Sequence, residues 1–249
     1  MSDSHDSTDT IGNKYSQQGH QGRPRNVVLY GESGVGKSSL INLIMGRDAA
    51  KTSPDALACT TTHAPYDATI SGQHFRLWDT AGFNEGSEGT VPAVMAERNL
   101  TAFLRGLNQE DGVHLLIYCT HYKIFSAVIR DSKVPTIIVV TCLEDFRPVM
   151  AEWWNENKDE LATYGMQFSG YACVTTLKDE PTESPDIHQR HAQSYNDVCR
   201  SILDHCSQTP HKTWGTEDQR SFLAILLQKL ARFVGGAHRD QDALKASLS

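Results

Sequence analysis

Short apolar runs alternate with longer amphipathic stretches between Asn26 and about residue 206. The short runs are nearly continuous in Val, Ile and Leu, which is typical of parallel strands covered on both faces. The stretches between them place apolar residues at helical spacing. The pattern predicts strands over 26–30, 65–70, 74–79, 113–119, 135–141 and 171–176, and helices over 38–46, 91–107, 124–131, 147–165 and 191–206.

The order of these elements predicts the fold class. Strands that alternate with helices are typical of a three-layer α/β/α sandwich around a mostly parallel sheet, here of six strands. Only Ser71, Gly72 and Gln73 separate the second strand from the third, so we expect a hairpin and one antiparallel strand. Residues 178–189 contain two prolines and several acids, and we interpret them as a surface loop.

The two ends of the chain depart from the pattern. Residues 1–23 are polar throughout and cannot bury enough apolar surface to offset their ordering entropy, so we expect a disordered tail. The sandwich would then span 24–208, followed by an amphipathic helix and tail over 209–249. This helix is expected to dock on the domain, on a partner or on a membrane surface. Its apolar face comprises Phe222, Leu223, Leu226, Leu227, Leu230, Phe233 and Val234.

Charge and cysteine content narrow the function classes. The formal net charge is -7, from 30 acidic and 23 basic residues, which argues against a broad nucleic-acid footprint. The six cysteines include no CxxC pair, and most lie in or beside apolar runs, as reduced thiols in a protein core do. No apolar run approaches the ~18 residues of a membrane span, and the N-terminal stretch does not resemble a signal peptide. We therefore expect a cytoplasmic protein without bound nucleic acid.

The stretch GESGVGKSS, residues 31–39, follows the first predicted strand and opens the first predicted helix. Gly31, Gly36, Lys37 and Ser38 match GxxxxGK[ST], a loop whose amides point at a phosphate chain that side chains would otherwise block. Lys37 places a cation on the phosphates, Ser38 offers a hydroxyl to Mg²⁺, and the helix N-terminus adds partial positive charge. The expected phosphate contacts are Glu32, Ser33, Gly34, Val35, Gly36, Lys37, Ser38 and Ser39.

Two further motifs complete a candidate triphosphate site. In LWDTAG, residues 77–82, Asp79 is expected to hold Mg²⁺ through water, and the Gly82 amide to report on the γ-phosphate. Between the two motifs lies ACTTTHAP, where a nucleotide switch needs a threonine that contacts both metal and phosphate. Thr60, Thr61 and Thr62 are all eligible, and Thr60 is favoured. The expected metal ligands are Ser38, Thr60 and Asp79, and Lys37 and Thr60 are assigned catalytic roles.

These motifs, in this order, resemble the P-loop GTPase G domain of the translation-factor-related class. The nearest branches are the Era-like, septin-like and immunity-associated ones, and the frame is closest to fungal G-domain proteins. The resemblance covers about residues 25–206. It implies that GTP or GDP binds with Mg²⁺ and switches the protein between two states, and that a homodimer or an activating protein is a partner.

The base-reading motif departs from this family pattern. The family usually has [NT]KxD where this chain has TCLED, residues 141–145. Thr141 fits the pattern and is able to tie this loop to the phosphate loop, whereas Cys142 replaces the lysine and Glu144 the aspartate. Two carboxylate oxygens still match the two guanine N–H groups, although the extra methylene changes their reach. Glu144 is therefore the expected base contact, Asp145 is the alternative, and relaxed or adenine binding stays open.

The hydrolytic machinery also departs from the pattern. Phe83 follows Gly82, where many switch GTPases carry a glutamine that orients the attacking water. Phenylalanine has no hydrogen-bonding group, so we expect slow Mg²⁺-dependent GTP hydrolysis. Asn84, Glu85 or a partner are the alternative sources of a polar group. The competing hypothesis is a non-hydrolysing scaffold whose bound nucleotide controls self-association or docking on a partner or membrane.

Overall fold

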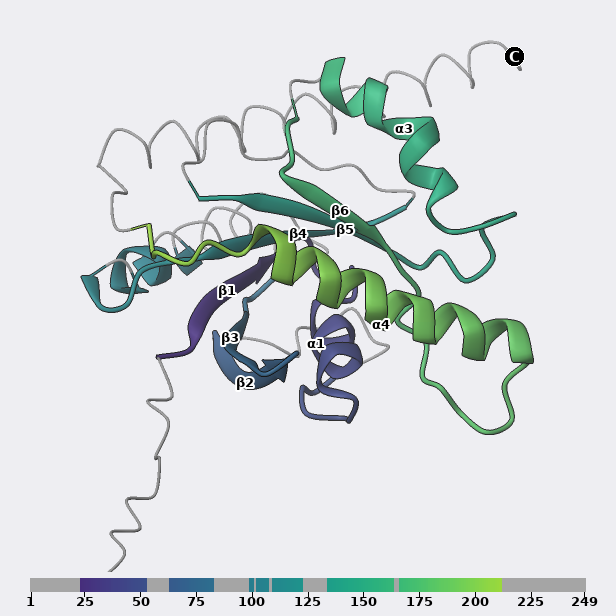
Figure 1. The fold of residues 1–249 in the computed structure, drawn as a ribbon, viewed down its shortest axis with the longest axis horizontal. Coiled ribbons are helices and arrows are strands. Elements are labelled where there is room, and N and C mark those ends of the chain that lie inside the picture. The colour runs from purple at the N-terminus through teal and green to yellow at the C-terminus, as the bar shows by residue number, and fades with distance from the viewer. Residues whose placement is uncertain are drawn as a thin grey trace, which may run out of the picture.

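The computed structural model describes residues 23–52, 63–82, 99–100, 102–107, 109–122, 134–163 and 166–211 (Figure 1). Within these residues the chain forms one six-stranded sheet with helices on both faces. The elements are β1 (Arg25–Tyr30), α1 (Lys37–Met45), β2 (Ala64–Ile70), β3 (Gln73–Asp79), β4 (Leu115–His121), β5 (Thr136–Thr141), α3 (Glu152–Thr163), β6 (Gly170–Cys173) and α4 (Pro185–His205).

The sheet has the strand order β2-β3-β1-β4-β5-β6. β1 pairs in parallel with β3 on one side and β4 on the other, and β5 lies parallel between β4 and β6. β2 and β3 pair antiparallel, as the short connection predicted. Ser71 and Gly72 at the turn both have positive φ, 47° and 75°, the backbone that matches the twist of a tight hairpin. The predicted fold class is confirmed.

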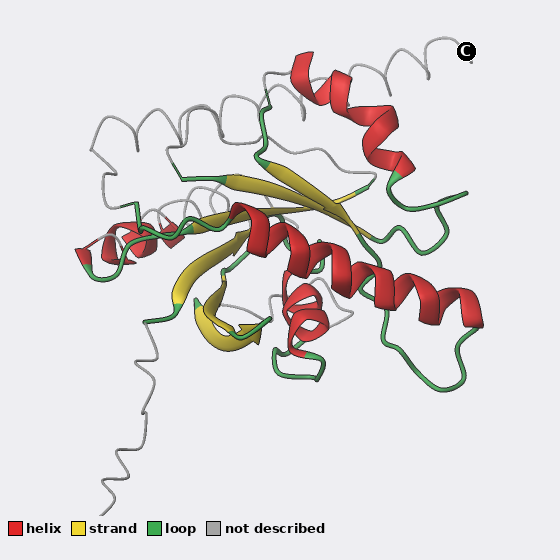
Figure 2. Ribbon diagram, viewed as in Figure 1, coloured by secondary structure: helices red, strands yellow, loops and turns green. Residues whose placement is uncertain are grey.

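The helices divide between the two faces of the sheet (Figure 2). α1 and α4 cover one face, where Leu40 and Ile41 of α1 and Val198 and Ile202 of α4 belong to one buried cluster. The other face lies under α3 and the helical residues 99–100 and 102–107, whose apolar side chains form a second buried cluster with the strands. The central strands are buried along almost their whole length because both faces are covered.

α4 begins six residues before the predicted start. Ser184 is its N-cap, with a side chain that accepts a hydrogen bond from Ile187 N, and Pro185 occupies the first turn. Proline suits the first turn because the N–H that it lacks would have no partner inside the helix. The interpretation of 178–189 as a loop was therefore wrong for its last five residues, because a Ser-Pro helix start was read as a turn.

α3 begins at Glu152, later than the predicted residue 147. The residue before a proline is disfavoured in helical backbone, and Arg147 precedes Pro148. Tight turns lead into the helix instead, since Glu152 N bonds to Val149 O at 3.1 Å and Trp153 N bonds to Met150 O at 3.2 Å. The result is an irregular segment between β5 and α3.

Several predictions fall on residues that the structure does not describe. These are the tail before residue 23, the helix over 124–131, part of the helix over 91–107, and the segment beyond 211. Thr60, Thr61, Thr62, Phe83, Asn84 and Glu85 also lie outside the described residues. Within the part of the chain that is described, no helix combines the length and the apolar character that crossing a bilayer requires.

Candidate functional site

The candidate site lies at the carboxyl end of β1, where the chain turns into α1. β1 has β3 on one side and β4 on the other, so the chain builds the sheet outward from β1 in both directions. Parallel α/β sheets bind ligands at such a switch point, outside the carboxyl ends of the strands. The loop between β1 and α1 needs glycine at particular places. Gly34 and Gly36 have φ of 77° and 88°, and a Cβ on Gly31 would lie 2.2 Å from Cys119 O.

The start of α1 is open to an anion. Its N-cap is Gly36, which has no side chain to bond to the first helical amides. Lys37 follows, with 7% of its surface exposed and its ammonium 2.8 Å from Glu32 O and 3.2 Å from Gly31 O. Helix amides, loop backbone and one cation therefore converge on the same point, which is the arrangement that binds phosphate.

The segment after β3 packs directly on this loop. Ser38 Oγ donates to Asp79 Oδ2 at 2.6 Å, and Asp79 is 2% exposed. Thr80 Oγ1 donates to Leu29 O at 2.7 Å, which ties the segment to β1. A Cβ on Gly82 would lie 2.5 Å from Ser33 Cα, so only glycine allows this approach. Two of the three motifs predicted from the sequence thus meet in space.

Ser38 and Asp79 fit a magnesium ion. Mg²⁺ prefers oxygen ligands and is held in phosphate sites by one or two carboxylates and hydroxyls together with phosphate oxygens. The hydroxyl of Ser38 and the carboxylate of Asp79 lie side by side at the start of α1, next to the phosphate loop. Thr60, the third predicted ligand, lies outside the described residues.

The loop that carries the predicted base contact is tied to the phosphate loop in the way that the sequence predicted. The Thr141 hydroxyl lies 2.9 Å from Val35 O and 3.1 Å from Thr120 O, and the residue is fully buried. Its methyl carbon also lies near Gly36, 3.6 Å from where a Cβ would stand. Thr141 therefore acts as a spacer that sets the distance between the two loops.

The carboxylate of Glu144 faces the segment that follows β6. Its Oε2 accepts a hydrogen bond from Thr175 Oγ1 at 3.1 Å, and Thr175 is fully buried. Glu144 is half-buried and Asp145 is exposed, so Glu144 is the better placed of the two predicted base contacts. Cys142 has a φ of 64° and is half-buried, and burial raises the pKa of its thiol.

An open cavity of about 470 Å³ adjoins this arrangement. It lies between α1 and residues 176–180, and Ser39 of the phosphate loop and Thr176 are in its wall. Thr176 Oγ1 also stands 3.4 Å from where a Gly36 Cβ would lie. The cavity therefore runs from the start of α1 along that helix toward the segment after β6, and its described lining includes neither Lys37 nor Glu144.

The cysteine that lies against the phosphate loop is a buried core thiol. Cys119, whose carbonyl contacts Gly31, is buried, and burial raises the pKa of its thiol to about 12. The five cysteines in the described residues are all free. Four of them are buried, as the sequence predicted for core thiols.

Sequence reasoning missed the residues that support Glu144 from α4. Ser194 Oγ accepts from Thr175 N at 3.0 Å, and Arg190 donates to the backbone of the loop that carries Glu144. Arg190 and Ser194 are fifteen or more residues from any of the motifs, so no local pattern marks them. Only the packing of α4 against both loops brings them to the site.

Comparison with known proteins gives a match to a family model over part of the chain, together with relatives in sequence and in fold. Residues 26–142 match the model of a family described as 50S ribosome-binding GTPase. The chain is 31% identical over 135 residues to GTPase Der of Bifidobacterium longum, which covers 51% of this chain and 28% of that protein. It is 26% identical over 180 residues to GTPase Der of Streptococcus pyogenes, which covers 68% and 40%. The chain thus spans less than half the length of these curated relatives.

Solved structures of GTPases share the fold. A crystal structure of Era from Aquifex aeolicus bound to GDP and AlF₄⁻ aligns with a TM-score of 0.54 at 17% identity, over 74% of this chain and 57% of that one. Era with 16S ribosomal RNA aligns with 0.54 at 17% identity, over 78% and 60%. A dimerization-deficient mutant of Toc33 from Arabidopsis thaliana aligns with 0.50 at 16% identity, over 73% and 83%.

Proposed function

We propose that this chain carries a P-loop GTPase domain of the translation-factor-related class, which binds GTP and GDP and hydrolyses GTP slowly as a nucleotide switch. The match of residues 26–142 to a GTPase family model supports this proposal. The observation that carries the proposal is the convergence of Lys37, Ser38 and Asp79 at the open N-terminus of α1. Glu144 is the group within the described residues that would read the base, and Thr175 holds its carboxylate.

Each residue of the site has a definite task in this proposal. The amides of residues 32–37 and the Lys37 ammonium bind the β- and γ-phosphates. Ser38 and Asp79 would hold Mg²⁺, which neutralises charge on the phosphates when it is bound. Gly82 lies against Ser33, and we propose that its amide senses whether a γ-phosphate is present. Thr60 is proposed to close over the γ-phosphate from the other side.

The two oxygens of Glu144 would accept the two N–H groups of guanine. Paired hydrogen bonds to a carboxylate discriminate strongly against bases that lack one of the donors. Thr175 bonds to Oε2 and keeps the side chain turned toward the segment after β6. We therefore propose a preference for guanine over adenine nucleotides.

The slow rate follows from the residue after Gly82. Phe83 has no group that orients a water molecule, so the attack on the γ-phosphate relies on charge neutralisation and positioning alone. An activating protein or a second copy of the chain would supply the missing polar group, an effect of about 10⁵-fold where an arginine is inserted. We propose such a partner, and a cytoplasmic location that suits the free thiols.

The lack of a water-orienting side chain at Phe83 also supports a second function. A chain without a water-orienting residue is able to act as a scaffold, in which bound GTP controls self-association or docking of residues 216–236 on a partner or a membrane surface. RNA is a weaker partner proposal because the net charge is -7, although one Era structure of this fold holds ribosomal RNA.

The experiment that tests the proposal compares nucleotides on the purified chain. Isothermal titration with GDP and with ADP in the presence of Mg²⁺ should give binding of GDP only. Single-turnover assays with GTP should give slow, Mg²⁺-dependent release of phosphate that Lys37→Ala abolishes. Absence of phosphate at high protein concentration, with GTP still bound, would leave the scaffold function in its place.

A further inference from the structure

Glu144 lies on an irregular loop, yet hydrogen bonds from neighbouring side chains hold this loop against α4. In the loop over 143–148, Phe146 N bonds within the loop to Leu143 O at 3.1 Å, and Leu143 N bonds to Val174 O after β6 at 3.3 Å. Arginine side chains donate to three of its carbonyl groups, those of Glu144, Phe146 and Pro148. The position of Glu144 therefore depends on how these arginines are held.

Arg190 is the central anchor of the loop. Its side chain is 7% exposed, and all three guanidinium nitrogens are used. Nε donates to Asp186 Oδ2 at 3.0 Å, Nη1 donates to Phe146 O at 3.1 Å, and Nη2 donates to Pro148 O at 3.2 Å. A planar guanidinium with fixed donors holds two backbone oxygens in one geometry, which a lysine could not do.

Arg147 ties Glu144 itself into the same network. Its Nη1 donates to Glu144 O at 2.9 Å, and its Nη2 donates to Asp186 Oδ2 at 3.0 Å. Asp186 thus accepts from a buried and an exposed arginine with the same oxygen. Arg147 therefore fixes the backbone of Glu144 to the first turn of α4, and Arg190 fixes the carbonyls of Phe146 and Pro148 to the same helix.

The side chain of Glu144 is fixed to the same helix by a second route. Ser194 Oγ donates to Arg190 O at 2.7 Å and accepts from Thr175 N at 3.0 Å. Thr175 Oγ1 in turn donates to Glu144 Oε2 at 3.1 Å. Asp186, Arg190 and Ser194 lie four residues apart, so they form one stripe along α4.

We propose that this stripe of α4 sets the base specificity of the nucleotide site. Asp186, Arg190 and Ser194 are positioning residues that hold the backbone and the carboxylate of Glu144 at once. The inference rests on the proposed function, since it assigns how that site selects guanine. These hydrogen bonds explain how a glutamate, which has one methylene more than aspartate, holds its carboxylate at a fixed position.

The experiment measures Kd for GDP and for inosine diphosphate, which lacks the exocyclic amine of guanine. The wild type should bind GDP more tightly, because a carboxylate with two acceptor oxygens loses one of its two donors in the inosine ligand. In Arg190→Met the ratio of the two Kd values should shrink by about ten- to a hundredfold. Binding of inosine diphosphate should weaken less than binding of GDP, because inosine diphosphate makes one hydrogen bond to the carboxylate where GDP makes two.

Two milder variants keep the test decisive if Arg190→Met does not fold. Arg147→Ala removes an exposed side chain, and Ser194→Ala removes the hydroxyl that bonds to Thr175 N. Both should shrink the ratio in the same direction. Arg200→Ala is the matched control, because Arg200 is an exposed arginine of α4 that also pairs with an aspartate of the same helix, Asp197. It should leave the ratio unchanged.

A double variant separates positioning from general destabilisation. Glu144→Gln should itself abolish the preference for GDP, and adding Arg147→Ala to it should then change nothing further. A folded Arg147→Ala or Ser194→Ala variant that keeps the wild-type ratio overturns the inference, while the proposed function stands. A wild type that binds GDP and inosine diphosphate equally overturns it as well. A wild type that binds neither nucleotide refutes the proposed function itself.

Discussion

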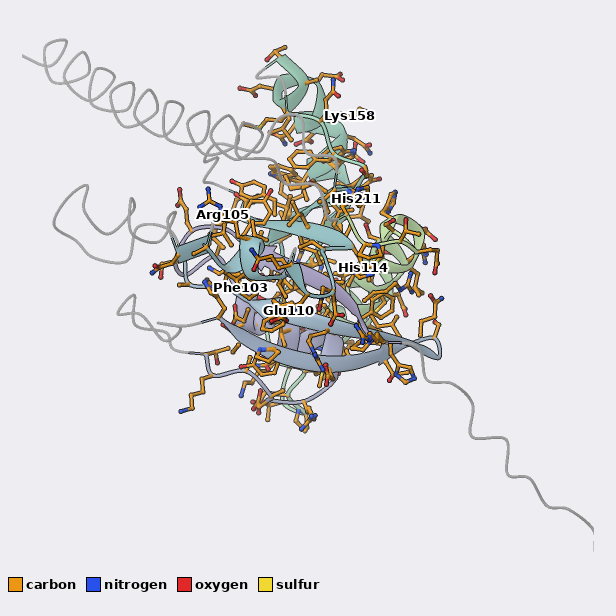
Figure 3. All side chains as sticks on the ribbon, turned by 90° about the vertical axis from the view of Figure 1, so that its left-hand side faces the viewer. Phe103, Arg105, Glu110, His114, Lys158 and His211 are labelled. Carbon is orange, nitrogen blue, oxygen red and sulfur yellow. The ribbon has the colours of Figure 1, made fainter. Side chains whose placement is uncertain are left out.

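The two ends of the parallel sheet use buried polar side chains in opposite ways. At the amino ends of the strands, Asn26 N donates to His114 Nδ1 at 3.0 Å, and Asn26 Nδ2 donates to Gly112 O at 2.9 Å. Trp78 Nε1 donates to Asn26 Oδ1 at 3.0 Å. His114 and His211, labelled in Figure 3, belong to this end, where the chain after α4 returns to pair with Val113. These groups bond to one another, and the result is a closed structural cluster.

The carboxyl ends of the strands present their polar groups on loops instead. Glycines with positive φ shape the phosphate loop, and the first amides of α1 have no side-chain cap. Helices that follow parallel strands all start at this end, so their partial positive charges gather there. The difference indicates that polar residues at the amino end stabilise the fold, whereas those at the carboxyl end are arranged to bind a ligand. The predictions below test this division.

The largest expected effect is on ligand affinity at the carboxyl end. Lys37→Ala removes the cation beside the phosphates and should weaken binding of GTP by at least about a hundredfold. The free energy of unfolding should change much less, because the two carbonyls that the ammonium contacts, Gly31 O and Glu32 O, belong to the phosphate loop and not to the sheet. Titration calorimetry and urea unfolding measure the two quantities. Lys158→Ala, an exposed lysine of α3, is the control and should alter neither.

The reverse result is expected at the amino end. Asn26→Ala leaves Gly112 O and Trp78 Nε1 without their partner in a buried region, which should cost about 2–4 kcal/mol of stability. Urea unfolding measures this loss, and affinity for GDP should stay at the wild-type value. Asn155→Ala, at an exposed position of α3, provides the control. A marked loss of GDP affinity in Asn26→Ala would show that the two ends are coupled.

His114 should make the amino end sensitive to acid. Burial, and then the charge of Arg25, lowers the pKa of His114 to about 4, and the residue is 6% exposed. Between pH 6.5 and about 4 the unfolded chain binds a proton that the folded chain does not, so stability falls as the pH falls. The loss is on the order of 3 kcal/mol. It should be complete near pH 4.

His114→Asn isolates this contribution. An asparagine oxygen takes the place of Nδ1 as the acceptor for Asn26 N but does not titrate in this range. Unfolding free energies of the wild type and the variant, measured from pH 7 to pH 4, should diverge as the pH is lowered, with the variant losing less. Parallel curves would remove His114 as the cause of acid sensitivity at this end.

The smallest effect concerns a polar residue near the carboxyl end whose role is structural. Ser184 caps α4, and Ser184→Ala should lower the free energy of unfolding by about 1 kcal/mol. Affinity for GDP should not change, because Ser184 contacts only the first turn of the helix. Ser184→Asp keeps a side-chain acceptor and should restore the stability. Loss of affinity in Ser184→Ala would show that capping and ligand binding are not separable here.

The sequence by itself determined the features that depend on neighbouring residues. Runs such as 26–30 and 136–140 predict buried strands because alternate and continuous apolar patterns follow from strand geometry. The phosphate loop is also local: its glycines, Lys37 and Ser38 are consecutive, and backbone conformation places them. The contact of Thr141 with the phosphate loop was also predicted, because Thr141 fits the first position of the [NT]KxD pattern.

Only the tertiary structure decided which distant groups meet. Glu144 contacts Thr175, Thr175 contacts Ser194, and Arg190 contacts Phe146, over separations of 31, 19 and 44 residues. Asn26 and His114 are 88 residues apart. The hydrophobic periodicity of the sequence does not predict such pairs, because they result from how α4 and the strands pack and not from the conformation of any one segment. Packing is a property of the whole chain, and it is packing that separates the closed end of the sheet from the end that binds.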